Sequence, residues 1–190
     1  MKNVTNMTTS IISAVITAIF IPILIVRYVC ISKLGVIFLS IGYPILLIYF
    51  ILKSIYFGLS NLKAKDVLYR IINVLIEIFI LLIISYFCLS LNSYIKWIIF
   101  GVICCLSLFN IFSSIFNKFN IIRYILQGII ALLFIYLILR FKSNIVSLMG
   151  IISILLFFIE NIIGRNTNNK LLLSSDIISI TLFSLFLLFI

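Results

Sequence analysis

The chain is a succession of apolar segments, each about 20 residues long, separated by short polar breaks. A segment of this length crosses the roughly 30 Å hydrocarbon core of a bilayer only as a helix. The segments lack the alternation of apolar and polar residues that indicates barrel strands. Hydrophobic residues make up 65% of the chain and charged residues 9%, far from the balance of soluble domains. We therefore predict an all-α polytopic transmembrane helix bundle with six or seven spans.

The polar breaks set the boundaries of the predicted spans within a single integral membrane domain, residues 1–190. The candidate spans are 9–29, 34–54, 68–90, 95–116, 121–140, 145–163 and 171–190. The last one differs from the others because only fourteen residues follow Asp176, which corresponds to about 21 Å of helix. Two interpretations remain open: a helix that begins near Leu171 with Asp176 shallow in the membrane, or a segment that only dips into the bilayer.

Lysine and arginine lie almost entirely in or beside the breaks, and their distribution predicts the orientation. The N-terminus and every second link hold nine of them, and the links of the opposite side hold five. Basic residues accumulate on the cytoplasmic side of membrane proteins, so we expect a cytoplasmic N-terminus, in a plasma or inner membrane. This use of the charge leaves no basic face outside the membrane edges, and nucleic acid is not an expected partner.

The residue types that the chain lacks argue against an enzyme. Histidine is absent, which excludes catalytic triads and zinc-protease motifs. The carboxylates are Asp66, Glu77, Glu160 and Asp176, and no two of them share a helical turn. The four cysteines show no CxxC or zinc-like spacing and are interpreted as small apolar residues. The sequence therefore predicts no catalytic residue, no metal site and no cofactor.

Glu77 is the residue that most needs an explanation, because it lies inside the third apolar segment. Residues three and four apart share a helix face, so Arg70, Asn73 and Glu77 form one stripe. A carboxylate is costly in lipid and marks a proton site, a cation site or a polar contact inside the bundle. The alternative is a structural role, in which Glu77 is neutral or bonded to Asn73 and a neighbouring helix.

Other polar residues are predicted at a similar depth on the neighbouring spans. The candidate proton, ion or substrate-binding residues are Glu77, Asn73, Gln127, Asn110, Glu160 and Asn161. On the predicted orientation they lie toward the cytoplasmic side, which indicates a polar vestibule open to the cytoplasm. The alternative is that polar residues simply become more frequent toward helix ends, and Glu160, five residues before Arg165, fits that alternative better.

Arginines near the ends of spans are predicted to anchor the helices at the membrane boundary. Arg27 precedes Tyr28 and is soon followed by Lys33, a combination typical of an interfacial anchor. Arg70 is expected to act in the same way at the start of the third span. A clamp for a substrate carboxylate is the alternative role for Arg27.

Small residues predict where helices approach one another closely. Ala14 and Ala18 form a small-xxx-small pair on the first span, and Gly35 and Gly42 lie one heptad apart on the second. Close backbone approach between membrane helices requires small side chains at the contact. We expect both pairs to lie on contact faces.

These features favour a small transporter, a channel-like protein or the integral subunit of a larger complex. The expected partners are the lipid bilayer and, for a complex, another membrane subunit or a second copy of the chain. One alternative is a structural or immunity-type interaction protein, in which the small-residue faces and basic links matter more than Glu77. Another is a membrane enzyme acting on lipid or peptide, which would need Glu77 and Glu160 to reach one substrate.

Overall fold

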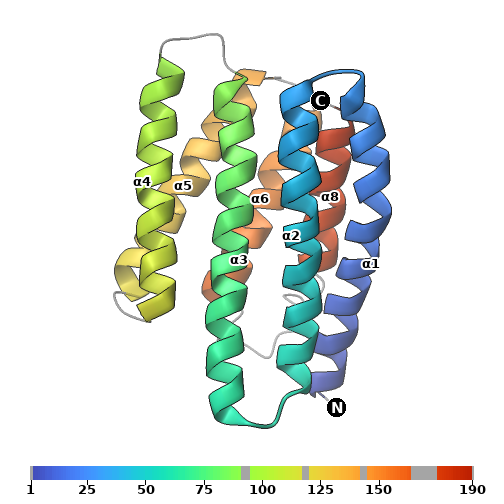
Figure 1. Cartoon of the computed structure of the whole chain (residues 1–190), viewed down its shortest axis with the longest axis vertical. Helices are drawn as coiled ribbons and strands as arrows, with labels where there is room; N and C mark the ends of the chain where they lie inside the picture. The colour runs from blue at the N-terminus through green and yellow to red at the C-terminus, as the bar shows by residue number, and fades with distance from the viewer. Residues whose placement is uncertain (1, 91–94, 117–119, 142–144, 164–174, 190) are drawn as a thin grey trace.

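The computed structural model of the chain describes residues 2–90, 95–116, 120–141, 145–163 and 175–189. Within these ranges the chain forms seven helices and no strand, which confirms the all-α class. The helices are α1 (Lys2–Val29), α2 (Lys33–Gly58), α3 (Leu62–Leu89), α4 (Ile95–Phe116), α5 (Asn120–Phe141), α6 (Ile145–Ile163) and α8 (Ser175–Phe189). Figure 1 shows that successive helices run in opposite directions, as short links require.

Four of the helices are long and apolar enough to cross a membrane. These stretches are Asn6–Val29, Lys33–Gly58, Leu62–Leu89 and Lys96–Phe116. Shorter apolar stretches occur in the remaining helices, at Tyr124–Arg140, Ile145–Ile159 and Ser175–Phe189. The helices are thus compatible with a membrane protein, and a bundle of six or seven spans stays a prediction.

The first helix begins earlier than the sequence predicts. It starts at Lys2 rather than at Thr9, because the polar residues before Thr9 continue the helix instead of ending it. The hydroxyl groups of Thr9 and Ser10 donate to the carbonyl of Asn6, at 3.0 and 3.1 Å, as hydroxyls inside a helix often do. The helix therefore extends more than one turn before the predicted apolar span.

The third helix also differs from its predicted span, and the start of the last span is not tested. α3 begins at Leu62, six residues before the predicted start, and Asn61 caps it by accepting a hydrogen bond from the backbone N–H of Lys63 at 3.0 Å. α8 begins at Ser175, and the predicted start at Leu171 lies outside the described residues. Fifteen residues of helix span about 22 Å, which is shorter than the hydrocarbon core.

The C-terminal helix α8 runs antiparallel to α2. Asp176 near its start pairs with Lys53 near the end of α2, at 2.5 Å. One and a half turns before the end of α8, the hydroxyls of Ser184 and Tyr43 lie 3.1 Å apart. These two contacts fix the register of α8, the helix drawn in red in Figure 1, against the N-terminal half of the chain.

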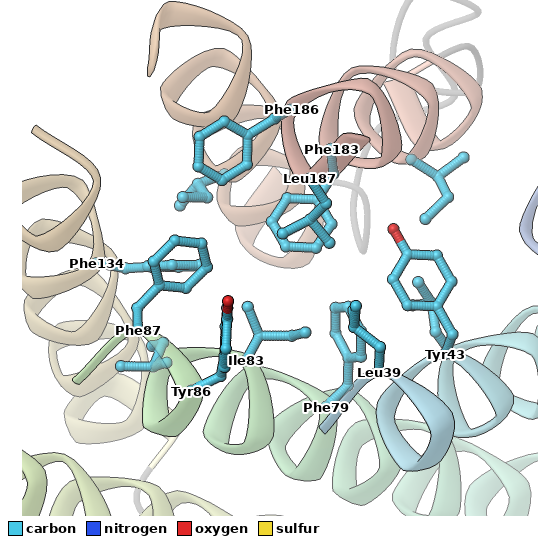
Figure 2. Packing of buried hydrophobic residues seen from close by; sticks show 14 of the residues in the cluster. Leu39, Tyr43, Phe79, Ile83, Tyr86, Phe87, Phe134, Phe183, Phe186 and Leu187 are labelled. Carbon is cyan, nitrogen blue, oxygen red and sulfur yellow. The ribbon is translucent and has the colours of Figure 1, made fainter. Parts of the chain in front are cut away.

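Aromatic side chains from α3, α5 and α8 form the centre of the bundle. Phe183 of α8 packs edge to face against Phe79 of α3, with ring centroids 6.0 Å apart, and against Phe134 of α5 at 6.3 Å. Phe186 of α8 stacks on Phe87 of α3 at 5.8 Å. Figure 2 shows these rings converging from separate helices. Offset and edge-to-face ring contacts are attractive beyond the area they bury.

Glycines on α2 allow close approach to α1 and α3. A Cβ atom at Gly35 would overlap the ring of Tyr28 and lie 3.3 Å from the ring of Tyr86. One at Gly42 would lie 3.7 Å from the ring of Phe79. Both glycines are buried, so this predicted contact face is present in the fold.

The alanine pair of α1 does not form the predicted contact face. Ala14 is buried, but Ala18 is exposed. The buried stripe of α1 passes instead through the polar residues Ser10, Ser13 and Thr17. These hydroxyl groups can bond to the backbone of their own helix, as Thr17 does with the carbonyl of Ser13 at 2.7 Å, and they are small enough to allow close packing.

Replacing Gly35 with alanine should destabilise the bundle. The new methyl group would displace Tyr28, whose hydroxyl donates to the carbonyl of Leu187 at 3.2 Å. Overpacking of this kind costs roughly 1–3 kcal/mol. The matched control is Gly101→Ala, because no atom lies within 4 Å of a Cβ built there. Thermal unfolding in detergent should give a lower melting temperature for G35A than for G101A, and the reverse order would contradict this packing.

Candidate functional site

The centre of the candidate site is a contact between Glu77 of α3 and Gln127 of α5. The Nε2 of Gln127 donates a hydrogen bond to Oε1 of Glu77. The side chains are almost fully buried, with 1% of Glu77 and 7% of Gln127 exposed. Glu77 lies fifteen residues after Leu62 and twelve before Leu89, in the middle third of its helix. The carboxylate is therefore inside the bundle and far from both ends of α3.

The local sequence explains why these two side chains face inward. On α3, Asn73, Ile76 and Glu77 are buried while Ile71 is exposed, so one face of the helix turns toward its neighbours. On α5 the buried positions recur every three or four residues, at Gln127, Ile130, Phe134, Leu137 and Ile138. Both buried faces are mostly apolar, and the polar side chains of Glu77 and Gln127 meet where the two faces pack together.

Asn110 on α4 lies at about the same level as Glu77. Nη1 of Arg70 donates to the carbonyl of Ile115 at 3.3 Å. This contact places Arg70 of α3 at about the level of Ile115 on the antiparallel helix α4. Asn110 is five residues before Ile115, about 7.5 Å along α4, which places it between the levels of Asn73 and Glu77. Its side chain is completely buried.

Buried polar residues of three helices thus occur within about two helical turns of Glu77 along the bundle, and we call this set the Glu77 cluster. Its members are Asn73 and Glu77 of α3, Ser107, Asn110 and Ser114 of α4, and Gln127 of α5. Several of their atoms have no hydrogen-bond partner among the described residues: Nδ2 of Asn73, both side-chain polar atoms of Asn110, Oγ of Ser107 and Ser114, and Oε1 of Gln127.

These buried polar atoms indicate a site for water or a ligand. Leaving a buried polar group without a hydrogen bond is costly, and native proteins satisfy nearly all such groups. Water molecules in protein interiors bind where two to four polar groups surround them. The Glu77 cluster supplies both hydrogen-bond donors and hydrogen-bond acceptors, because amides donate and accept while a carboxylate accepts.

A cavity adjoins the Glu77 cluster between α3, α5, α6 and α8. Its volume is about 60 Å³, and among the described residues that line it Glu77 and Gln127 are the only polar ones. The other lining residues are Ile76, Phe79, Ile80, Ile83, Ile84, Ile130, Ala131, Phe134, Ile154, Phe157, Phe158 and Phe183. Glu77 and Gln127 thus line one end of an otherwise apolar cavity.

The remaining predicted site residues lie elsewhere or outside what the structure describes. The side chains of Glu160 and Asn161, on α6, are outside the described residues. Arg27 is exposed near the end of α1, and Arg70 is exposed near the start of α3. Tyr28 does not join Arg27 at the surface: it turns inward and is 1% exposed. An anchoring role for the two arginines stays a prediction.

The pairing of Lys53 with Asp176 is a feature that sequence reasoning missed. Their side chains are only 13% and 4% exposed, so the pair is largely shielded from solvent. Lys53 also lies over the ring of Tyr49, 5.5 Å from its centroid. Asp176 interrupts an apolar segment, and an acidic residue there requires a partner. That requirement was readable in the sequence, but the identity of the partner was not.

The chemistry open to the site is hydrogen bonding, proton binding and pairing with a cation. Among the residues that the structure describes, no three His, Cys, Asp or Glu side chains come together as metal ligands.

No family model, no curated protein and no solved structure matches the chain. The function must therefore be argued from the site itself.

Replacing Asp176 with asparagine should weaken the attachment of α8. Breaking a buried ion pair from one side costs roughly 3–5 kcal/mol, because the other charge stays buried. Unfolding in a detergent titration should show a clear loss of stability for Asp176→Asn and for Lys53→Met. The double variant should be less destabilised than the sum of the two. Strictly additive losses would contradict the pairing, and Asp66→Asn, at an exposed position, is the matched control.

Proposed function

We propose that the protein carries a proton or a small cation through the membrane, with Glu77 as the group that binds it. The observation that carries the proposal is the position of the Glu77 carboxylate. It is 1% exposed and lies in the middle third of a helix that is long and apolar enough to span a bilayer. Ionisable residues in such positions typically belong to proton relays or ion pathways.

The contact with Gln127 supports this role. A hydrogen bond from Nε2 stabilises the ionised carboxylate, and burial stabilises the neutral one. The two effects oppose each other, so binding of a proton or a cation can shift the balance between the states. A carboxylate held in this way can bind a proton or a cation and release it again. A residue that only filled space would not need an ionisable group, because burying a charge is costly.

The polar face of α4 provides a route for water to Glu77. Ser114, Asn110 and Ser107 follow one another along the buried face of that helix at intervals of four and three residues. Their atoms without partners are suited to bind a short file of water molecules between α3 and α4. With the N-terminus in the cytoplasm, Ser114 is nearest the cytoplasmic end, because α4 ends on the same side as α1 begins (Figure 1).

The same site suits a protein that acts alone and one that serves as the integral subunit of a larger complex. The two possibilities differ in a measurable way. A protein that acts alone supports flux when the purified chain is the only protein in the vesicle. A subunit gives no flux until its partner is added.

Replacing Glu77 with glutamine should abolish transport without loss of assembled protein. The amide has nearly the same shape but cannot take up a proton or pair with a cation. Proton flux into vesicles containing the purified protein would be followed with a trapped pH-sensitive dye, and cation flux with a cation-sensitive dye. We expect at least a tenfold slower rate for E77Q, with an unchanged elution volume in size-exclusion chromatography.

The control is Asp66→Asn, which makes the same chemical change at an exposed position near the start of α3. This variant should transport at the wild-type rate. Glu77→Asp keeps the charge on a shorter side chain and should retain part of the flux. A wild-type rate for E77Q would overturn the role of Glu77. Wild-type vesicles that leak no faster than empty ones would overturn transport by the chain alone.

A further inference from the structure

We infer that the cavity beside Glu77 binds ammonium or a small primary alkylammonium ion, such as methylammonium. The inference rests on the proposed function and names the class of cation that the site would take. It is drawn from three properties of the cavity: the charge at one end, the aromatic wall and the volume.

The polar end of the cavity suits a ligand that donates hydrogen bonds. Oε1 of Gln127 accepts no hydrogen bond from the described residues, although the side chain is 93% buried and lines the cavity. Glu77 contributes a carboxylate beside it. Both groups are acceptors, and one of them carries a negative charge when ionised. An ammonium group, with several N–H donors and a positive charge, complements this pair.

The rest of the wall excludes well-hydrated metal ions. Calcium takes six to eight oxygen ligands and magnesium demands an octahedral set, whereas this cavity offers the oxygens of two side chains. Five phenylalanine rings line it instead: Phe79, Phe134, Phe157, Phe158 and Phe183. The face of an aromatic ring attracts an ammonium cation, which is the basis of quaternary ammonium recognition in proteins.

The volume limits the ligand to a few heavy atoms. The cavity measures about 60 Å³, while an apolar cavity of about 150 Å³ is known to hold benzene, with its six carbon atoms. Simple proportion leaves room for about two or three heavy atoms. Ammonium, methylammonium and ethylammonium meet this limit. Tetramethylammonium and aromatic amines exceed it.

The outer wall suggests how such a ligand enters. Ala131 of α5 and Phe157 and Phe158 of α6 line the cavity and are only half-buried, so the cavity lies close to the surface between these two helices. A neutral amine can pass through lipid to this point. Its nitrogen lone pair then takes the proton of the protonated Glu77 carboxyl: the O–H bond breaks, an N–H bond forms, and an ammonium–carboxylate pair results.

Binding can be measured on the purified full-length chain in detergent, without any assay of transport. Methylammonium chloride, at millimolar concentration and constant ionic strength, should raise the melting temperature of the wild-type protein by several degrees. Sodium chloride and tetramethylammonium chloride should leave it unchanged, because the cavity offers sodium the oxygens of only two side chains and tetramethylammonium exceeds the cavity. Titration calorimetry would give the dissociation constant.

Two variants locate the effect. Glu77→Gln should weaken methylammonium binding at least tenfold. Ala131→Leu adds three carbon atoms at the cavity wall while Glu77 and Gln127 stay in place, and it should also abolish binding. Its control is Ala18→Leu, at an exposed position of α1, which should bind like the wild type. Ala131→Leu must elute as the wild type does in size-exclusion chromatography, which shows that it is folded. Phe158→Leu removes one ring and adds no bulk, and its binding of methylammonium should weaken as well.

The outcomes separate this inference from the proposed function. If methylammonium does not bind the wild type, or binds E77Q and A131L as tightly as the wild type, the cavity is not its site. The transport measurement on E77Q is independent of this result. If tetramethylammonium or sodium binds with equal affinity, the assigned class of cation is wrong. If methylammonium binds but vesicles show no flux, the ligand site is retained and transport by the chain alone is overturned.

Discussion

The burial of the Glu77 carboxylate is the constraint on which the rest of the bundle depends. A charged or polar group in an apolar interior is stable only when other groups satisfy it. The amide of Gln127 does so from α5, and this contact ties α5 to α3 at one level. Helices that carry only aliphatic side chains could slide or rotate against each other at little cost, since lipid is as apolar as leucine. A polar contact at one point removes that freedom.

The same requirement acts at a second place, where Asp176 of α8 meets Lys53 of α2. In the aromatic centre, Phe183 of α8 touches rings from α3 and α5 (Figure 2). The cavity is bounded by these rings and by Glu77 and Gln127. Its shape is therefore determined by the packing of phenylalanine, isoleucine and alanine side chains, and its chemistry by the carboxylate and the amide.

The residues of α3 and α1 show which features of the fold can be predicted from the sequence alone. The periodicity of α3 predicts that Asn73 and Glu77 share a face, and the cost of a charge in lipid predicts that this face turns inward. Neither argument identifies which helix supplies the partner, because a helical period says nothing of the neighbour that it faces. The start of α1 at Lys2 was missed for a related reason: hydropathy marks where lipid begins, whereas a helix continues as long as its backbone hydrogen bonds are satisfied.

The sequence by itself determined the all-helical class, the apolar segments and the few polar residues that need partners, because these follow from composition and from spacing along one helix. Only the tertiary structure decided that Gln127 meets Glu77, that Lys53 meets Asp176, and that a cavity remains beside the first pair. These contacts join residues that are 50 and 123 positions apart in the chain. Their formation depends on how the side chains of several helices fill space together, and no local pattern encodes that.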